Sequence, residues 1–125
     1  MKIMIVDDHS AMRRVLKQQL EMSISDSVEI LECESGEEAI EEYDSFLPDY
    51  TLLDYQLKQI NGLETARLIN QKDPFANVII VTSYDSAYLR NKANSLNIKG
   101  FVSKENLSEI AKFIITKTPQ QNKTL

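Results

Sequence analysis

The stretch KIMIVDD, residues 2–8, decides the predicted fold, because its apolar residues run directly into two carboxylates. Three later stretches repeat this arrangement, each an apolar run that ends on a polar or charged residue: YTLLD (50–54), VIIVTS (78–83) and FVSK (101–104). Short apolar runs rich in Ile and Val, separated by helical patterns, are typical of buried parallel strands. The carboxyl ends of parallel strands meet at one edge of an open sheet, where ligands bind. We therefore expect three carboxylates, a hydroxyl and an ammonium group to share one crevice: Asp7, Asp8, Asp54, Thr82 and Lys104.

Strands and helices are predicted to alternate along the whole chain. The apolar patterns predict strands at about 2–6, 28–32, 49–53, 77–81 and 98–102, and helices at about 10–22, 35–46, 63–73, 86–96 and 105–115. Ser10 is predicted to cap the first helix, and Ser35 opens the second with the Ser-x-x-Glu pattern of a capping box. The alternation predicts an α/β fold with a doubly wound, five-stranded parallel sheet of the flavodoxin-like type. The polar strand at 28–32 belongs at the edge, which gives the strand order 2-1-3-4-5.

Composition and charge indicate one small soluble domain. We expect a domain over residues 1–117 and a polar tail over 118–125. The net charge of −5 argues against direct binding to nucleic acid or to an anionic membrane. Cys33 is the single cysteine, which favours a reducing compartment, and no apolar run approaches the roughly 20 residues of a membrane span. These features predict a cytoplasmic protein.

The predicted crevice has the chemistry of a site for Mg²⁺ and phosphate. Clustered carboxylates repel one another at neutral pH unless a cation joins them or their pKa values are raised, and oxygen ligands favour Mg²⁺. The Thr82 hydroxyl and the Lys104 ammonium group suit phosphate oxygens, and Asp54 can act as the nucleophile. No other side chain of the crevice is an evident general acid or base, so a covalent acceptor fits better than a turnover enzyme. His9, the single histidine, cannot build a metal site alone and is expected to be structural or solvated.

Over about residues 1–115 the chain resembles the receiver domains of bacterial two-component response regulators, in particular the chemotaxis-type receivers. The resemblance rests on five short segments in the expected order: VDD (6–8), LD (53–54), NGLE (61–64), TS (82–83) and FVSK (101–104). Each segment alone is a weak signal. Together, each at the end of its predicted strand or at the start of a helix, they are specific.

The resemblance implies a phosphorylation-dependent signalling switch that is not an enzyme in the ordinary sense. It implies that Asp54 accepts a phosphoryl group from a sensor histidine kinase, and that Mg²⁺ is held by Asp7, Asp8, Asp54 and the backbone carbonyl of Gln56. It further implies that Lys104 pairs with the phosphoryl group, that Thr82 moves toward it, and that Phe101 rotates inward and changes a partner-binding face. The implied partner is a downstream protein or a phosphotransfer protein. The resemblance leaves open whether the phosphorylated form is a homodimer.

Three departures from the family pattern concern single residues. Lys58 stands where the family usually has proline, which adds a positive charge near the site. Glu105 follows Lys104 in place of proline, and His9 follows the acidic pair. The last two features resemble receivers of LuxR-type regulators, so the chain is either a stand-alone receiver or the front part of a longer regulator.

Three other classes of protein compete with this interpretation. A haloacid-dehalogenase-type phosphatase needs Asp-x-Asp after the first strand, whereas Asp7 and Asp8 are adjacent. A flavodoxin needs a hydroxyl-rich phosphate loop where this chain has acidic residues. The runner-up is a pseudo-receiver, a binding module that acts without phosphate.

Overall fold

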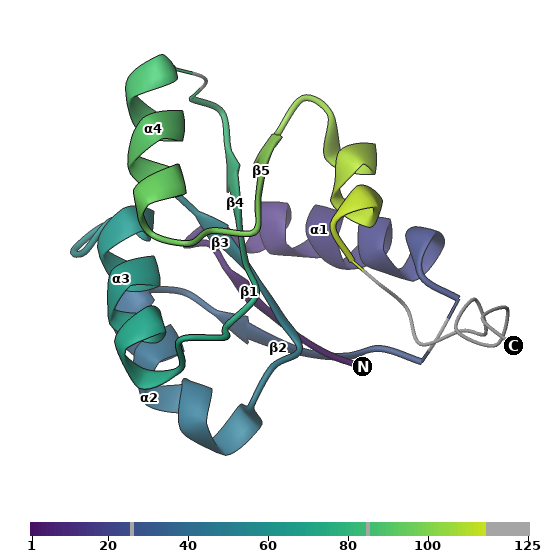
Figure 1. The fold of residues 1–125 in the computed structure, drawn as a ribbon. Helices are drawn as coiled ribbons and strands as arrows, with labels where there is room; N and C mark the ends of the chain where they lie inside the picture. The colour runs from purple at the N-terminus through teal and green to yellow at the C-terminus, as the bar shows by residue number, and fades with distance from the viewer. Residues whose placement is uncertain (26, 85, 115–125) are drawn as a thin grey trace, which may run out of the picture.

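The fold is a five-stranded parallel sheet with helices on both faces (Figure 1). It is described by a computed structural model that covers residues 1–25, 27–84 and 86–114. The strand order is β2-β1-β3-β4-β5, and all four neighbouring pairs are parallel. The strands are β1 (Lys2–Val6), β2 (Glu29–Cys33), β3 (Tyr50–Asp54), β4 (Val78–Thr82) and β5 (Gly100–Ser103). The doubly wound sheet and its strand order, with the polar strand at the edge, confirm the prediction.

The helices cover the two faces of the sheet, and alternate residues of the strands supply the two cores. They are α1 (Ser10–Ser23), α2 (Gly36–Phe46), α3 (Gly62–Lys72), α4 (Ala87–Ser95) and the 3₁₀ helix η1 (Leu107–Lys112). Ile3, Ile5 and Leu52 belong to the core under α1 and η1, while Met4 and Leu53 belong to the core under α2 and α3. This alternation follows from the two-residue period of a strand. Among the described residues, no helix is both long enough and apolar enough to span a membrane.

β3 and β4 each begin and end one residue later than the predicted ranges of about 49–53 and 77–81. Asp54 is therefore the last residue of β3 and pairs with Val81, and Thr82 is the last residue of β4 and pairs with Ser103. Both functional candidates thus lie within the hydrogen-bonded sheet, which restrains their backbones more than a loop would.

The prediction that Ser10 caps α1 is wrong, because His9 holds the N-cap position and Ser10 is already helical. The His9 N–H donates to Asp7 Oδ1 at 2.9 Å, and this bond turns the chain into the helix one residue early. The prediction for Ser35 is confirmed, since its hydroxyl accepts from the Glu38 N–H at 3.0 Å. Glu38 Oε1 accepts from the Glu34 N–H, so the reciprocal bond of the capping box is displaced to the residue before the cap.

The last predicted helix is shorter and tighter than expected. The range of about 105–115 is replaced by the 3₁₀ helix η1, which begins at Leu107. A turn takes up the first residues, because Ser103 Oγ accepts from the Glu105 N–H and the Ser103 carbonyl accepts from the Asn106 N–H. Residue 115, the predicted boundary at 117 and the predicted tail at 118–125 lie outside the described residues.

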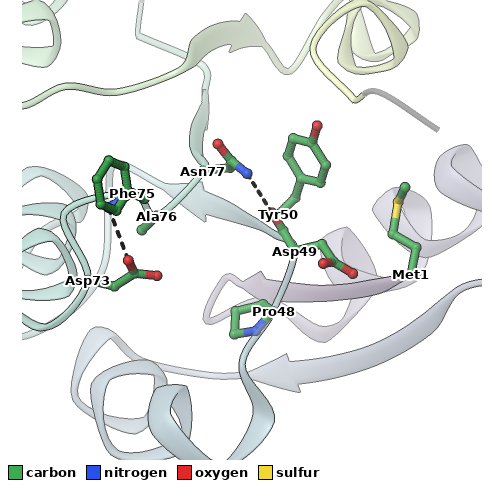
Figure 2. Close-up of a pocket in the computed structure, with 8 residues that line it drawn as sticks. All are labelled: Met1, Pro48, Asp49, Tyr50, Asp73, Phe75, Ala76 and Asn77. Atoms are coloured by element: carbon green, nitrogen blue, oxygen red, sulfur yellow. Dashed lines mark hydrogen bonds between the residues drawn. The ribbon is translucent and has the colours of Figure 1, made fainter. Parts of the chain in front are cut away.

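A hollow of about 270 Å³ lies at the amino ends of the strands, the edge opposite Asp54 (Figure 2). Its two carboxylates already serve the fold. Asp49 Oδ2 accepts from the Lys2 N–H at 2.7 Å, and Asp73 accepts from the Tyr43 hydroxyl and the Phe75 N–H. The Asn77 side chain bonds the Asp49 carbonyl at 3.0 Å. The polar groups of the hollow therefore connect the beginnings of the strands. We expect the functional site at the opposite edge of the sheet, where the strands end.

Cys33 is predicted to be unreactive in the native protein. Its side chain is buried at the end of β2, and burial, assisted by the charges of Glu38 and Glu42, raises the pKa of the thiol to about 12. At pH 8 we expect a thiol-exchange reagent to modify Cys33 at least about 100-fold more slowly in the native protein than in urea, because the thiolate is the nucleophile.

The same shift fixes a pH dependence. The unfolded thiol loses its proton near its ordinary pKa while the native thiol keeps it, so Cys33 lowers the stability as pH rises from about 9 toward 12.

In the thiol-exchange experiment, a modification rate in the native protein equal to the rate in urea would contradict the burial of Cys33.

Candidate functional site

Two buried carboxylates and one lysine form the centre of the site. Asp7 follows β1, Asp54 ends β3, and β1 and β3 are neighbours in the sheet. Lys104, just after β5, places its Nζ 3.2 Å from Asp7 Oδ2 and 3.3 Å from Asp54 Oδ2. The side chains of Asp7 and Asp54 are 0% and 3% exposed, so the ammonium group offsets charge that little water can reach.

Asp8 adds a carboxylate at the mouth of the crevice. Its side chain is 12% exposed, and its buried Oδ1 atom has no hydrogen-bond partner among the described residues. A buried carboxylate oxygen without a donor is costly in protein interiors. The chemistry of this atom therefore favours a cation at the acidic pair.

His9 lies against the acidic pair, although the sequence alone predicted that it is structural or solvated. Its Nδ1 atom is 3.1 Å from Asp8 Oδ1 and 3.3 Å from Asp7 Oδ1. One ligand atom from each of Asp7, Asp8 and His9 lies within 4.8 Å of the others. The ring is still 72% exposed, so His9 is solvated and in contact with the site at once. The adjacent Asp-Asp-His sequence was the available signal.

Arg13 is a second residue that sequence reasoning missed. Its Nη1 donates to the Asp7 carbonyl at 2.7 Å, and its Nε donates to Glu32 Oε1 at 2.8 Å. The guanidinium group thus ties α1 to the ends of β1 and β2 and holds a positive charge behind the acidic pair. Its position one helical turn after His9 was the only sequence signal.

The Thr82 hydroxyl and the Phe101 ring have partners outside the acidic centre. The Thr82 hydroxyl is buried and accepts from the Tyr84 N–H at 3.0 Å, while the Thr82 carbonyl accepts from the Lys104 N–H at 2.9 Å. Phe101 is half-buried, and the Arg90 guanidinium carbon lies 4.5 Å from its ring centroid. The structure therefore brings Asp7, Asp8, Asp54 and Lys104 together and leaves the hydroxyl of Thr82 engaged in its own loop.

Two hydrogen bonds hold the loop that follows Asp54, the acceptor candidate. The Gln56 N–H donates to Asp54 Oδ1 at 3.3 Å, and the Gly62 N–H donates to the Tyr55 carbonyl at 2.8 Å. A Cβ atom at Gly62 would stand 2.4 Å from the Asp54 carbonyl oxygen, so only glycine permits this approach. The ring of Tyr55 also meets that of Tyr84 edge to face, with centroids 6.0 Å apart.

Burial and the neighbouring charge of Asp7 raise the pKa of Asp54. Lys104 and the Gln56 N–H oppose this rise but do not cancel it. The site thus holds excess negative charge in a poorly solvated place, and a bound cation would relieve it.

A buried carboxylate at the end of a central strand, beside an acidic pair and a lysine, defines a class of small α/β domains with a charged site at a topological switch point. Residues 3–115 match the family described as the response regulator receiver domain. The chain belongs to this family, which confirms the resemblance found in the sequence.

Relatives from two kinds of bacterial protein are similar to the chain. It is 33% identical over 108 residues to the transcriptional regulatory protein YdfI of Bacillus subtilis, covering 86% of this chain and 50% of that protein. It is 34% identical over 104 residues to the chemotaxis protein CheY of Listeria monocytogenes, covering 83% of this chain and 86% of that protein. The chain thus spans about half the length of the transcriptional regulators that it matches.

A solved structure with the same fold is the signal receiver domain of the response regulator NarL from Mycobacterium tuberculosis. Its TM-score is 0.79 at 26% identity, and the match covers 89% of this chain and 90% of that one. The architecture is therefore that of a receiver domain.

Replacing Asp54 by asparagine is predicted to stabilise the fold. The native carboxyl has a raised pKa, so between the unfolded and native pKa values the native state holds more protons and its stability falls as pH rises. Asp54→Asn removes this penalty, and we expect a gain at pH 7 of about 0.5–2 kcal/mol in the free energy of unfolding.

Urea unfolding at pH 7 and at pH 4 measures this effect. The gain should shrink at pH 4, near the ordinary aspartate pKa of about 3.9. Glu41→Gln, at an exposed position of α2, is the matched control and should change little. A loss of stability in Asp54→Asn at pH 7 would show that the carboxylate is not under electrostatic strain.

Proposed function

We propose that this chain is a phosphorylation-dependent signalling switch whose phospho-acceptor is Asp54, with a sensor histidine kinase as donor and Mg²⁺ as cofactor. Membership of the receiver family supports the general class. One observation carries the assignment of the residue. Asp54 is buried at the end of the central strand β3, with the Lys104 ammonium group 3.3 Å from its carboxylate.

The acceptor step needs a nucleophile and compensation of charge. A carboxylate oxygen of Asp54 forms a bond to phosphorus while the bond from phosphorus to the donor's imidazole nitrogen breaks. The imidazole leaves with the electron pair and takes up a proton. Lys104 moves from ion pairing with Asp54 to the phosphoryl oxygens, which a short, charge-assisted bond favours. Positioning and charge neutralisation are most of what phosphoryl transfer requires.

The donor set fits Mg²⁺. Asp7, Asp8, Asp54 and the Gln56 carbonyl would hold the ion, and the unpartnered buried Asp8 Oδ1 supports this assignment. Such an ion supplies neutralisation of the phosphoryl oxygens. Hard oxygen donors, several of them charged, are the usual environment of Mg²⁺ in phosphoryl-transfer sites.

The response to phosphorylation would run through Thr82 and Phe101. To reach a phosphoryl group on Asp54, the Thr82 hydroxyl must turn from the Tyr84 N–H, which reshapes the loop before α4. Phe101 would leave the Arg90 guanidinium and turn inward. The added charge thus biases two side chains with alternative partners, and the face near α4 and β5 changes.

The proposed partners are the kinase and a downstream protein or phosphotransfer protein. We place the switch within residues 1–117, with 118–125 as a tail, and assign no direct nucleic acid binding to this segment. A homodimer of the phosphorylated form is compatible with these roles. If the chain is part of a longer regulator, its output module would contact the same face near α4 and β5.

Phosphorylation of Asp54 is tested with Mg²⁺ and a small acyl-phosphate donor, by intact mass. One acid-labile phosphoryl adduct is expected in the native chain, and none in Asp54→Ala or without Mg²⁺. Asp44→Ala, at an exposed carboxylate of α2, is the control and should accept phosphate normally.

Absence of an adduct with several donors and with a histidine kinase would support the alternative, a pseudo-receiver that binds partners without phosphate. An adduct that persists in Asp54→Ala would place the acceptor elsewhere and overturn the assignment.

A further inference from the structure

We propose that His9 is a nitrogen ligand of the cation site, so that this site binds borderline divalent ions such as Zn²⁺ in competition with Mg²⁺. This inference rests on the proposed function, because it concerns the ion expected at Asp7 and Asp8. It goes beyond that function by adding a ligand that a site for Mg²⁺ does not need.

The distances at His9 suit donor atoms that share one ion. Its Nδ1 atom is 3.1 Å from Asp8 Oδ1 and 3.3 Å from Asp7 Oδ1. Two donors bonded to one ion at about 2.1 Å stand about 3.0 Å apart at octahedral angles and about 3.4 Å apart at tetrahedral angles. The three residues therefore need little rearrangement to close on an ion.

The second observation is the partnerless oxygen. Asp8 Oδ1 is buried and accepts no hydrogen bond from the described residues, although His9 Nδ1 is its near neighbour. The short distance thus lacks the geometry of a hydrogen bond. A cation between the two atoms would give Asp8 Oδ1 a partner, in exchange for the 3.3 Å hydrogen-bond contact between His9 Nδ1 and Asp7 Oδ1.

The backbone fixes His9 in this place. His9 is the N-cap residue of α1, and its N–H donates to Asp7 Oδ1 at 2.9 Å. The ring is 72% exposed, so water can complete the coordination of an ion. Lys104 contacts the other oxygen of Asp7, Oδ2, so the lysine and the ion do not need the same oxygen of that residue.

Ion preference follows from the nitrogen donor. Imidazole suits Zn²⁺ and other late divalent ions, whereas Mg²⁺ takes oxygen ligands and keeps several waters. A site of two carboxylates and one imidazole should therefore bind Zn²⁺ more tightly than a site of carboxylates alone. Because Asp8 belongs to both ligand sets, the two ions should exclude each other.

The test uses the full chain and the metals alone. His9 is the single histidine, so selective ¹⁵N labelling of histidine gives signals from one ring. Zn²⁺ should shift the Nδ1 resonance strongly. Calorimetric titration should give a Zn²⁺ dissociation constant that rises at least about 10-fold in His9→Ala, while that for Mg²⁺ changes less than about 2-fold. Added Mg²⁺ should weaken Zn²⁺ binding to the native chain.

His9→Asn is the matched variant, because asparagine caps helices well and replaces the nitrogen donor by an amide oxygen at a similar reach. It should bind Mg²⁺ as the native chain does and Zn²⁺ more weakly. Equal Zn²⁺ affinities in the native chain and His9→Asn, or an unmoved Nδ1 resonance when Zn²⁺ binds, would overturn the role of His9.

Failure of the proposed function is distinguishable. If only the role of His9 fails, Zn²⁺ binds equally to the native chain and to His9→Asn, while Mg²⁺ binding and the Asp54 adduct are retained. If neither the native chain nor His9→Asn binds Mg²⁺ or forms the adduct, the proposed function fails. In that case a shifted Nδ1 resonance with Zn²⁺ would still support the zinc site.

Discussion

The contact of one ammonium group with two buried carboxylates is the constraint on which the site depends. Lys104 comes from the end of β5, and its two partners come from the ends of β1 and β3. The three side chains meet only if all strands run parallel in the observed order, because only then do these ends share one edge. Without the lysine, Asp7 and Asp54 would face each other as uncompensated buried charges. The order of the sheet and the electrostatics of the site are therefore one requirement.

Backbone bonds to the carboxylates hold these charges in place. The His9 N–H bonds Asp7, and the Gln56 N–H bonds Asp54, so each carboxylate also organises the loop that follows its strand. Gly62 lets α3 begin against the backbone of the acceptor candidate. A site that acts through positioning and charge compensation needs side chains that their neighbours hold in place.

The sequence was sufficient for the strand order and for the meeting of Asp7, Asp54 and Lys104, because apolar runs and their final residues determine which groups reach the edge. It was insufficient where the outcome depends on side-chain orientation. The cap at His9 results from a bond to Asp7 that spacing alone does not reveal. Arg13 reads as an exposed helical residue until its reach to the Asp7 carbonyl is known. Turn bonds of the Ser103 side chain and carbonyl likewise shorten the last helix, although its apolar pattern favours a full α-helix.

The two candidate switch residues differ from the acidic centre in one physical respect. Asp7, Asp54 and Lys104 contact one another, whereas the Thr82 hydroxyl and the Phe101 ring contact groups outside this acidic centre, the Tyr84 N–H and the Arg90 guanidinium group. Each of these outside contacts is worth only about 1 kcal/mol, whereas a phosphoryl group brings nearly two negative charges. In the proposed switch, a strong local change therefore competes with weak contacts. A domain built in this way can keep its sheet and its acidic centre fixed while the loop before α4 and the face at β5 change partners.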